Sequence, residues 1–379
     1  MNLLSQRLKN ATLLISLALS VNAFAEQDAT NTTASKVLTS AAQTTVVKKN
    51  KTAKLASKKS SKATYEQYVE QLKKQALENK KFDKAIVEQA FSQITFYKRA
   101  VKADRSQPEK VETLDTYLPK RLPKWKIEKA RKLFKQHHTL LTKIGEKYGV
   151  QPRFIIALWG LETNFGKYTG HFNVVSALAT LAYEGRREAF FKKQLWAALQ
   201  ILSEGHISPK KMIGSWAGAM GQNQFMPTSF LAYAVDGDGD GKKDIWTDTT
   251  DVFASIANYL KQEGWNDELT WGRQVKLPAD FETSLAIPKN TGSRKKWLAA
   301  WKQREKSLAQ WQSLGVRRTD GTNLPVVDIK AVLVFPDDVH GRAYLAYNNY
   351  KSLMHWNLSY YFVSSVGHLA DSIKFPPIK

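Results

Sequence analysis

The sequence predicts a mainly helical α+β protein, in which helical segments precede a small β-rich region. Three observations support this fold class. Apolar residues recur at spacings of three and four over much of residues 65–149. Short segments with β-branched residues and partial alternation follow residue 265. A hydrophobic content of 43% with 11 tryptophans is enough for a large core. We expect a helical subdomain over 64–149, a central core over 150–265 and a small β-rich domain with a terminal helix over 266–379.

The first residues have the features of an export signal. Arg7 and Lys9 precede an apolar run over 11–20, and a small-residue A-x-A cleavage site follows at 23–25. We therefore expect a signal peptide over 1–25. A membrane anchor is the weaker interpretation, because a spanning helix needs roughly 20 apolar residues.

The formal net charge of +23 predicts attraction to polyanions, such as cell-wall polymer, anionic lipid or nucleic acid, without choosing among them. Part of this charge lies in residues 26–63, where Thr, Ala, Ser and Lys dominate and which we expect to be a disordered basic linker. A tether without a specific partner is the simpler interpretation of that linker. The chain has no cysteine, which excludes disulfides, thiolate chemistry and cysteine-ligated zinc.

Individual elements follow from the apolar spacing. Helices are expected over 65–80, 82–94 and 126–149. Strands are expected within 271–281, 326–335 and 342–347, with a helical stretch over 292–314 and a final helix over 360–373. No repeat of fixed period is visible, which excludes a solenoid.

Glu162 is a carboxyl on an otherwise apolar helix. Ile155, Leu158 and Trp159 share its face, and Gly166 is the expected left-handed stop of the helix. Burial and the negative end of the helix dipole both disfavour the ionised form, so we expect a raised pKa and a group that can donate a proton near neutral pH. The alternative is a core glutamate that is paired to an arginine or hydrogen-bonded locally, since structural networks also perturb pKa values.

The segment from Asp236 to Asp244 has the spacing of an EF-hand calcium loop. Its aspartates stand at positions 1, 3, 5 and 9, and a glycine stands at position 6. Thr247 occupies position 12 in place of the usual glutamate, so Asp248 or Asp251 must close the site. We expect a structural calcium ion held by Asp236, Asp238, Asp240, Lys242 and Asp251. A turn without an ion is the alternative.

Two further segments suggest ligand contacts. The glycine-rich stretch 214–230 places Ser215, Gln222, Asn223 and Gln224 near aromatic residues, which suits the hydroxyls and C–H faces of sugars. Tight helix packing is the alternative for this stretch. Arg186 and Arg187 can clamp an anionic group bidentately, although an exposed helix face explains them equally simply.

These motifs together resemble the membrane-bound lytic murein transglycosylase B family, glycoside hydrolase family 103. The resemblance rests on ALWGLETNFG, YEGRREAFF, GSWAGAMGQNQFMPTSF and the Asp-Gly loop followed by ASIANYLKQEGW, and it extends over residues 65–379 with RSQPE and YLAYNNYKSLMHWNLSYY. It implies a lysozyme-like core and cleavage of the MurNAc-β-1,4-GlcNAc bond of peptidoglycan without water, which leaves 1,6-anhydroMurNAc ends. It also implies that Glu162 acts first as acid and then as base.

The resemblance also assigns cleft residues. They are Tyr117, Arg186, Arg187, Ser215, Gln224, Tyr259 and Asn357. The family usually has Tyr-Asn and a following Tyr where this chain has Trp356-Asn357 and Phe362, so stacking is kept and two hydroxyls are lost. Glycosidases ordinarily use two carboxylates, whereas the cleft motifs here offer only Glu162. The substrate's own 2-acetamido oxygen and C6 hydroxyl are then the expected nucleophiles.

The absence of cysteine departs from the lipoprotein members of this family. We expect a periplasmic monomer, soluble or peripherally attached, that binds peptidoglycan and other cell-wall enzymes but no nucleic acid. Two rival functions use the same residues. One is a muramidase that hydrolyses the same bond with Glu162, and the other is a non-catalytic scaffold that binds the cell wall.

Overall fold

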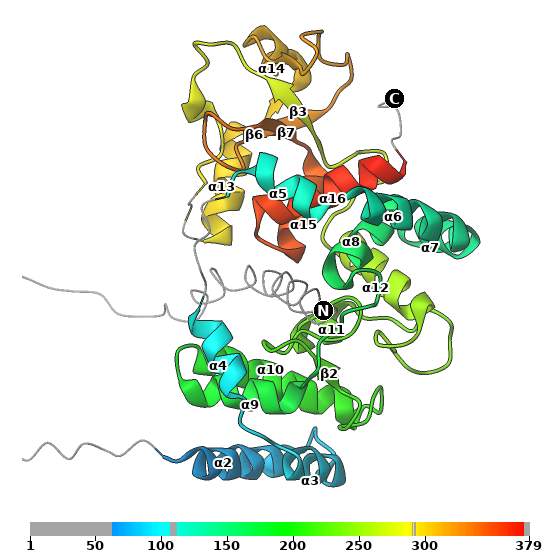
Figure 1. The fold of residues 1–379 in the computed structure, drawn as a ribbon, viewed down its shortest axis with the longest axis vertical. Helices are drawn as coiled ribbons and strands as arrows, with labels where there is room; N and C mark the ends of the chain where they lie inside the picture. The colour runs from blue at the N-terminus through cyan, green and yellow to red at the C-terminus, as the bar shows by residue number, and fades with distance from the viewer. Residues whose placement is uncertain (1–62, 107–111, 290, 292, 375–379) are drawn as a thin grey trace, which may run out of the picture.

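The computed structural model describes residues 63–106, 112–289, 291 and 293–374. These residues are mainly helical with small antiparallel sheets, which confirms the predicted α+β class. Figure 1 shows the larger sheet at one end of the long axis, helices α2 and α3 at the other end, and α8, α11 and α12 between them. The predicted signal peptide, and the linker up to residue 62, lie outside the described residues.

The helices before the larger sheet account for most of the molecule. They are α2 (Tyr65–Glu78), α3 (Lys84–Ser92), α4 (Lys98–Arg105), α5 (Leu114–Arg121), α6 (Lys124–Gln136), α7 (His138–Tyr148), α8 (Pro152–Thr163), α9 (Val174–Glu184), α10 (Glu188–Ser203), α11 (Pro227–Tyr233) and α12 (Thr249–Gln262). Strands β1 (Phe172–Asn173) and β2 (Ile213–Gly214) pair antiparallel within this part.

The remaining elements form the larger sheet and its surroundings. They are β3 (Gly272–Lys276), η1 (Thr283–Leu285), α13 (Arg294–Arg304), β4 (Lys306–Ser307), α14 (Leu308–Ser313), β5 (Arg317–Arg318), β6 (Lys330–Val334), β7 (Ala343–Ala346), α15 (Asn348–Trp356) and α16 (Tyr360–Ile373). The three predicted strands and the final helix are thus confirmed, whereas the predicted helical stretch 292–314 is divided into α13 and α14 by β4.

A second predicted helix, 126–149, is also divided. His137 ends α6 with φ −101° and ψ 15°, and α7 starts at the next residue. The His137 ring packs edge-on against Trp159 and Phe253, with centroids 6.1 and 5.4 Å apart. The break thus places His137 against α8 and α12, a tertiary contact that the local apolar spacing of 126–149 does not encode.

Two hydrophobic clusters cross the predicted domain boundaries. The α9 cluster joins α9 and α10 to α2, α3 and α4 through residues such as Leu72, Phe91 and Leu195. The α8 cluster joins α5–α8 to α12, α15 and α16 through residues such as Leu114 and Leu369. Helices of the predicted subdomain 64–149 therefore belong to two clusters. The division of the chain into domains over 64–149, 150–265 and 266–379 stays a prediction.

The larger sheet has the strand order β4-β6-β7-β3-β5 and is antiparallel in every pair. Alternate residues of β6 and β7 face opposite sides: Val332 and Tyr344 join the α8 cluster, while Leu333 and Leu345 join a separate cluster with Trp311. Because both faces of these strands are buried, their sequences are nearly continuous runs of apolar residues. The sheet is thereby fixed to the helices that carry the site.

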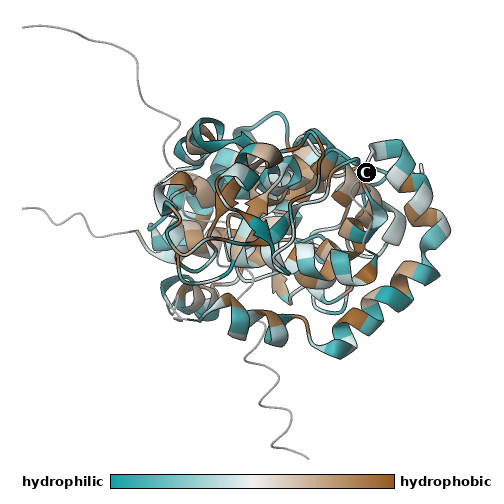
Figure 2. Ribbon diagram, turned by 90° about the horizontal axis from the view of Figure 1, so that it is seen from above, coloured by the Kyte–Doolittle hydropathy of each residue, from teal (hydrophilic) through white to brown (hydrophobic). Residues whose placement is uncertain are grey.

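Apolar segments concentrate in the middle of the molecule and hydrophilic ones at its edge (Figure 2). Within the described residues, no helix has the length and apolar character needed to cross a membrane.

Candidate active site

Glu162 lies one residue before the end of α8. The helix ends at Thr163, and Asn164, Phe165 and Gly166 all have positive φ, at 54°, 61° and 76°. The predicted stop at Gly166 is therefore wrong, because Asn164 is the left-handed cap, a conformation that asparagine tolerates better than most residues. Thr163 stabilises the turn by accepting from the Gly166 N–H and donating to the Gln222 carbonyl, both at 3.0 Å.

The loop after Glu162 packs closely against the glycine-rich segment 214–230. A Cβ on Gly166 would lie 2.2 Å from the Gln222 Oε1, and a Cβ on Gly170 would lie 2.0 Å from the Gly214 carbonyl oxygen. Both glycines have positive φ as well. Their small size is needed for the two segments to meet beside Glu162.

The carboxyl group of Glu162 is half-buried and accepts a hydrogen bond from an indole. Trp356 donates its Nε1–H to Oε1 of Glu162 at 2.6 Å. Desolvation by the surrounding protein raises the pKa of Glu162 to about 7, while the Trp356 bond and the charge of Arg121 act in the opposite direction. A carboxyl with this pKa can both release and take up a proton near neutral pH.

Arg121, which sequence reasoning did not identify, is the cation near Glu162. It ends α5 and donates from Nη2 to the Leu161 carbonyl at 2.7 Å. Its Nε is buried and has no hydrogen-bond partner among the described residues. The predicted cleft residue Tyr117 is on the same helix, α5, and both it and Glu162 lie near enough to influence the pKa of Arg121.

Aromatic rings form a wall next to Glu162. Trp356 packs on Tyr259 and Phe225, with ring centroids 4.7 and 5.3 Å apart, and Tyr259 in turn packs on Tyr233 at 4.2 Å. The structure therefore connects the predicted Tyr259 to Glu162 through Trp356. The interpretation of Trp356 as a simple loss of a hydroxyl is incomplete, because its indole N–H contacts the carboxyl directly.

The amides of the glycine-rich segment differ in their availability. Gln222 accepts from Trp159 Nε1 at 2.7 Å and donates to the Trp246 carbonyl, and Asn223 is fully buried and donates to the Val252 carbonyl. These two amides, which we expected to offer bonds to sugars, are thus engaged in holding the loop.

The predicted cleft residues Ser215 and Gln224 are partly exposed. Gln224 adopts a left-handed φ of 51° and donates to the Thr169 and Gly221 carbonyls, which fixes it beside the loop after α8. Ser215 accepts from the Ala219 N–H. Asn357, which caps α15, is 5% exposed, and its Oδ1 has no hydrogen-bond partner among the described residues.

Arg186 and Arg187 share one acidic partner, Asp104 on α4. Arg186 donates through Nε and Nη2 to the side chain and carbonyl of Asp104, both at 2.9 Å, and Arg187 bonds the other carboxylate oxygen. Asp104 is 1% exposed, so its charge is buried between the two arginines. One carboxylate neutralises one of the two positive charges, and the Arg186 side chain remains half-exposed.

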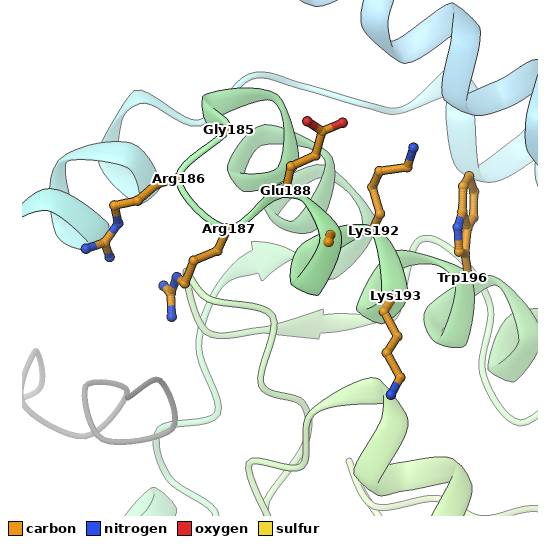
Figure 3. Close-up of a pocket in the computed structure, with 8 residues that line it drawn as sticks. Gly185, Arg186, Arg187, Glu188, Lys192, Lys193 and Trp196 are labelled. Carbon is orange, nitrogen blue, oxygen red and sulfur yellow. The ribbon is translucent and has the colours of Figure 1, made fainter. Parts of the chain in front are cut away.

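The two arginines lie at an open pocket at the start of α10. Its lining consists of Gly185, Arg186, Arg187, Glu188, Ala189, Lys192, Lys193 and Trp196. In Figure 3, Arg186 and Arg187 point to one side of this helix start, while Glu188 and Lys192 point to another. The pocket is therefore a basic surface rather than a set of converging groups.

Three carboxylates of the predicted calcium loop converge. Asp236, Asp238 and Asp251 each offer an oxygen within 4.8 Å of the others. Asp251 is 1% exposed, and burial, with the charges of Asp248 and Asp238, raises its pKa to about 6. A buried carboxylate beside two others fits a hard cation such as Ca²⁺, which prefers oxygen ligands.

The other carboxylates of this loop have structural contacts. Asp248 caps α12, and Asp244 accepts from the N–H groups of Trp246 and Thr247. Asp240 accepts from the Lys242 N–H at 2.8 Å, and Asp240 does not join the converging set. The structure thus brings together three of the five expected ligands.

Known proteins are similar to this chain over most of its length. Residues 64–371 match the family model of the transglycosylase SLT domain. A curated relative, membrane-bound lytic murein transglycosylase B of Escherichia coli (strain K12), is 37% identical over 158 residues, which cover 40% of this chain and 44% of that protein. The match thus spans less than half the length of this relative.

Solved structures give broader coverage. SltB3 from Pseudomonas aeruginosa, in complex with NAG-anhNAM-pentapeptide, is 40% identical with a TM-score of 0.75, and the match covers 82% of this chain and 80% of that chain. The Escherichia coli lytic transglycosylase Slt35, in complex with calcium, is 25% identical with a TM-score of 0.64, and the match covers 81% and 92%. These similarities confirm the lysozyme-like fold class.

Proposed function

Since the chain belongs to the transglycosylase SLT domain family, we propose that it is a peptidoglycan lytic transglycosylase. The bond cleaved is the MurNAc-β-1,4-GlcNAc linkage, and the product carries a 1,6-anhydroMurNAc end. The observation that carries this proposal is Glu162, a half-buried carboxyl held by Trp356 at 2.6 Å and near Arg121. The relative SltB3, solved with a muropeptide that contains anhNAM, supports the substrate class.

In the first step, protonated Glu162 donates its proton to the glycosidic oxygen as the C1–O4 bond breaks. The substrate's 2-acetamido oxygen assists departure and forms a bond to C1. The GlcNAc product leaves with the proton as its 4-hydroxyl. Glu162 is then an anion, which the Trp356 N–H and the positive charge of Arg121 stabilise.

In the second step, the Glu162 carboxylate removes the proton from the C6 hydroxyl of the same sugar. O6 attacks C1, the bond from the acetamido oxygen to C1 breaks, and Glu162 regains its proton. No water is consumed. In this proposal Glu162 serves as both acid and base, in contrast to the two carboxylates used by most glycosidases.

The proposed substrate contacts follow the predicted cleft residues. Tyr259 supplies an aromatic surface beside Trp356, and Tyr117, Ser215, Gln224 and Asn357 supply hydrogen bonds to sugar substituents. Arg186, with its half-exposed side chain and a charge that Asp104 only partly neutralises, binds carboxylates of the substrate. Arg187 donates to the other carboxylate oxygen of Asp104 and so helps to hold the carboxylate that positions Arg186. The enzyme acts in the periplasm, where peptidoglycan lies.

Clearing of a peptidoglycan-containing gel by the purified protein tests this function against the scaffold alternative. The proposal expects clearing at neutral pH, because an enzyme turns over while a scaffold only binds. Binding of the protein to peptidoglycan with neither clearing of the gel nor release of soluble muropeptides would contradict it and favour the scaffold.

We also propose that Asp236, Asp238 and Asp251 hold a structural calcium ion, as the calcium complex of Slt35 suggests. An ion that binds only the folded state stabilises it by about 2.7 kcal/mol at 100 times its Kd. Chelator is therefore expected to lower the Tm of the wild type. Asp251→Asn is expected to have a low Tm that chelator does not change.

The exposed turn residue Asp320 provides the control, since Asp320→Asn should keep the full response to chelator. Titration with calcium should restore the wild-type Tm. A wild-type transition that is identical with and without chelator would exclude a structural ion.

A further inference from the structure

We propose that Trp356 is a positioning residue that binds Oε1 of Glu162 and so makes Oε2 the oxygen that carries and transfers the proton. This inference rests on the proposed function, since it concerns how Glu162 works as acid and base. It adds a residue from the end of helix α15 to the reaction, at a position where the family resemblance leads one to expect tyrosine.

The chemistry of the contact defines which oxygen is free. Indole Nε1–H is a donor and never an acceptor, so at 2.6 Å it requires a lone pair on Oε1. In a protonated carboxyl, the carbonyl oxygen is the better acceptor and the other oxygen carries the hydrogen. The Trp356 bond therefore favours the form with Oε1 as carbonyl and the hydrogen on Oε2. A tyrosine hydroxyl can donate or accept, so it would not make this choice.

Trp356 is itself held in place. Its ring packs on Tyr259 at 4.7 Å and on Phe225 at 5.3 Å, and it contacts both the α8 cluster and the α9 cluster. These contacts restrict the rotation of the indole, so its N–H is directed before substrate binds. Such fixed donors stabilise charge without reorganisation during the reaction.

The bond also tunes the acid. Burial raises the pKa of Glu162, whereas the Trp356 N–H stabilises the carboxylate and lowers the pKa. Without this bond the pKa would rise further, so Glu162 would be a weaker acid in the first step. Activity that requires protonated Glu162 is lost as the pH rises through its pKa, about 7 in the wild type.

Trp356→Phe tests the proposal because it keeps an aromatic ring and removes the N–H. We expect kcat at the pH optimum to fall about 10-fold, the loss typical of one hydrogen bond to a charged group, with KM nearly unchanged. The alkaline limb of kcat/KM should move to higher pH, because the carboxylate has lost a donor.

The matched control is Trp297→Phe. Trp297 is buried, at 3% exposed, whereas Trp356 is partly buried, and Trp297 donates its indole N–H to the Tyr360 hydroxyl at 2.8 Å. This variant should lose stability but keep the wild-type kcat and alkaline limb, measured below the Tm of all three proteins. If the alkaline limb of kcat/KM in Trp356→Phe coincides with that of the wild type, the proposal is overturned.

A direct titration separates this inference from the proposed function. The ¹³C carboxyl shift of Glu162, assigned by its absence in Glu162→Gln, gives the pKa in the folded protein without substrate. A higher pKa in Trp356→Phe supports the positioning role even if peptidoglycan is not cleaved. An unchanged pKa overturns the role even if the wild type is an active transglycosylase.

Discussion

Glu162→Gln is expected to lower peptidoglycan cleavage by at least about 10²- to 10⁴-fold, the usual contribution of a general acid–base group. The amide has nearly the same shape, and its oxygen can accept the Trp356 N–H that now binds Oε1. It can neither protonate the leaving oxygen nor accept the proton of the C6 hydroxyl. Both steps of the reaction are therefore blocked, and the rate is measured from muropeptide release.

The same variant is expected to be at least as stable as the wild type. The pKa of Glu162 is raised to about 7 by burial, so the unfolded chain releases this proton at lower pH than the folded chain. The wild type therefore loses stability as the pH rises from about 4.3, the ordinary value of a glutamate, to about 7. The Tm of Glu162→Gln relative to the wild type should rise over this interval.

Glu146→Gln is the matched control, because Glu146 is exposed on α7. It should keep wild-type cleavage and the wild-type pH dependence of Tm. Persistent clearing by Glu162→Gln at the wild-type rate would mean that another group is the acid.

Asp371→Ala is expected to cost about 3–5 kcal/mol of unfolding free energy, the typical effect of breaking a buried ion pair. Asp371 on α16 bonds Arg153, which is 3% exposed at the start of α8, at 2.5 Å. It also accepts from Trp271 Nε1 at 3.0 Å, next to β3. The substitution leaves a buried guanidinium unpaired where the catalytic helix, the sheet and α16 meet.

Urea unfolding of the variant measures this cost. Asp328→Ala, at an exposed position, should change the unfolding free energy by less than about 0.5 kcal/mol. The double variant Asp371→Ala/Arg153→Met should recover part of the loss, because no unpaired charge remains. A loss below about 1 kcal/mol in Asp371→Ala would show that Arg153 finds another partner or water.

The sequence could predict features that depend on neighbouring residues. The apolar face around Glu162 and the spacing of the Asp-Gly loop are local patterns, and the structure keeps Glu162 near the end of α8 and brings Asp236, Asp238 and Asp251 together. The strands could be located for the same reason. Their order, with β7 between β6 and β3, depends on tertiary packing that alternation does not describe.

The partners of the site residues could not be predicted, because they come from distant parts of the chain. Trp356 is 194 positions from Glu162, and Arg121 is 40 positions from the Leu161 carbonyl that it binds. Asp104 is 82 positions from Arg186. The adjacent arginines alone indicated an anion clamp, whereas the buried Asp104 already occupies part of their hydrogen-bonding capacity. The sequence showed that Trp356 departs from the family pattern. The hydrogen bond from its indole to Glu162 depends on how the side chain is oriented, which only the structure shows.

In the proposed mechanism Glu162 acts alone and the substrate's C6 hydroxyl replaces water. Mass spectrometry of the muropeptides released from purified peptidoglycan tests this most directly. We expect muramoyl ends that are lighter by one water than the products of hydrolysis, as 1,6-anhydro rings require. Ends that carry the additional water as the main product would contradict it and identify the protein as a muramidase.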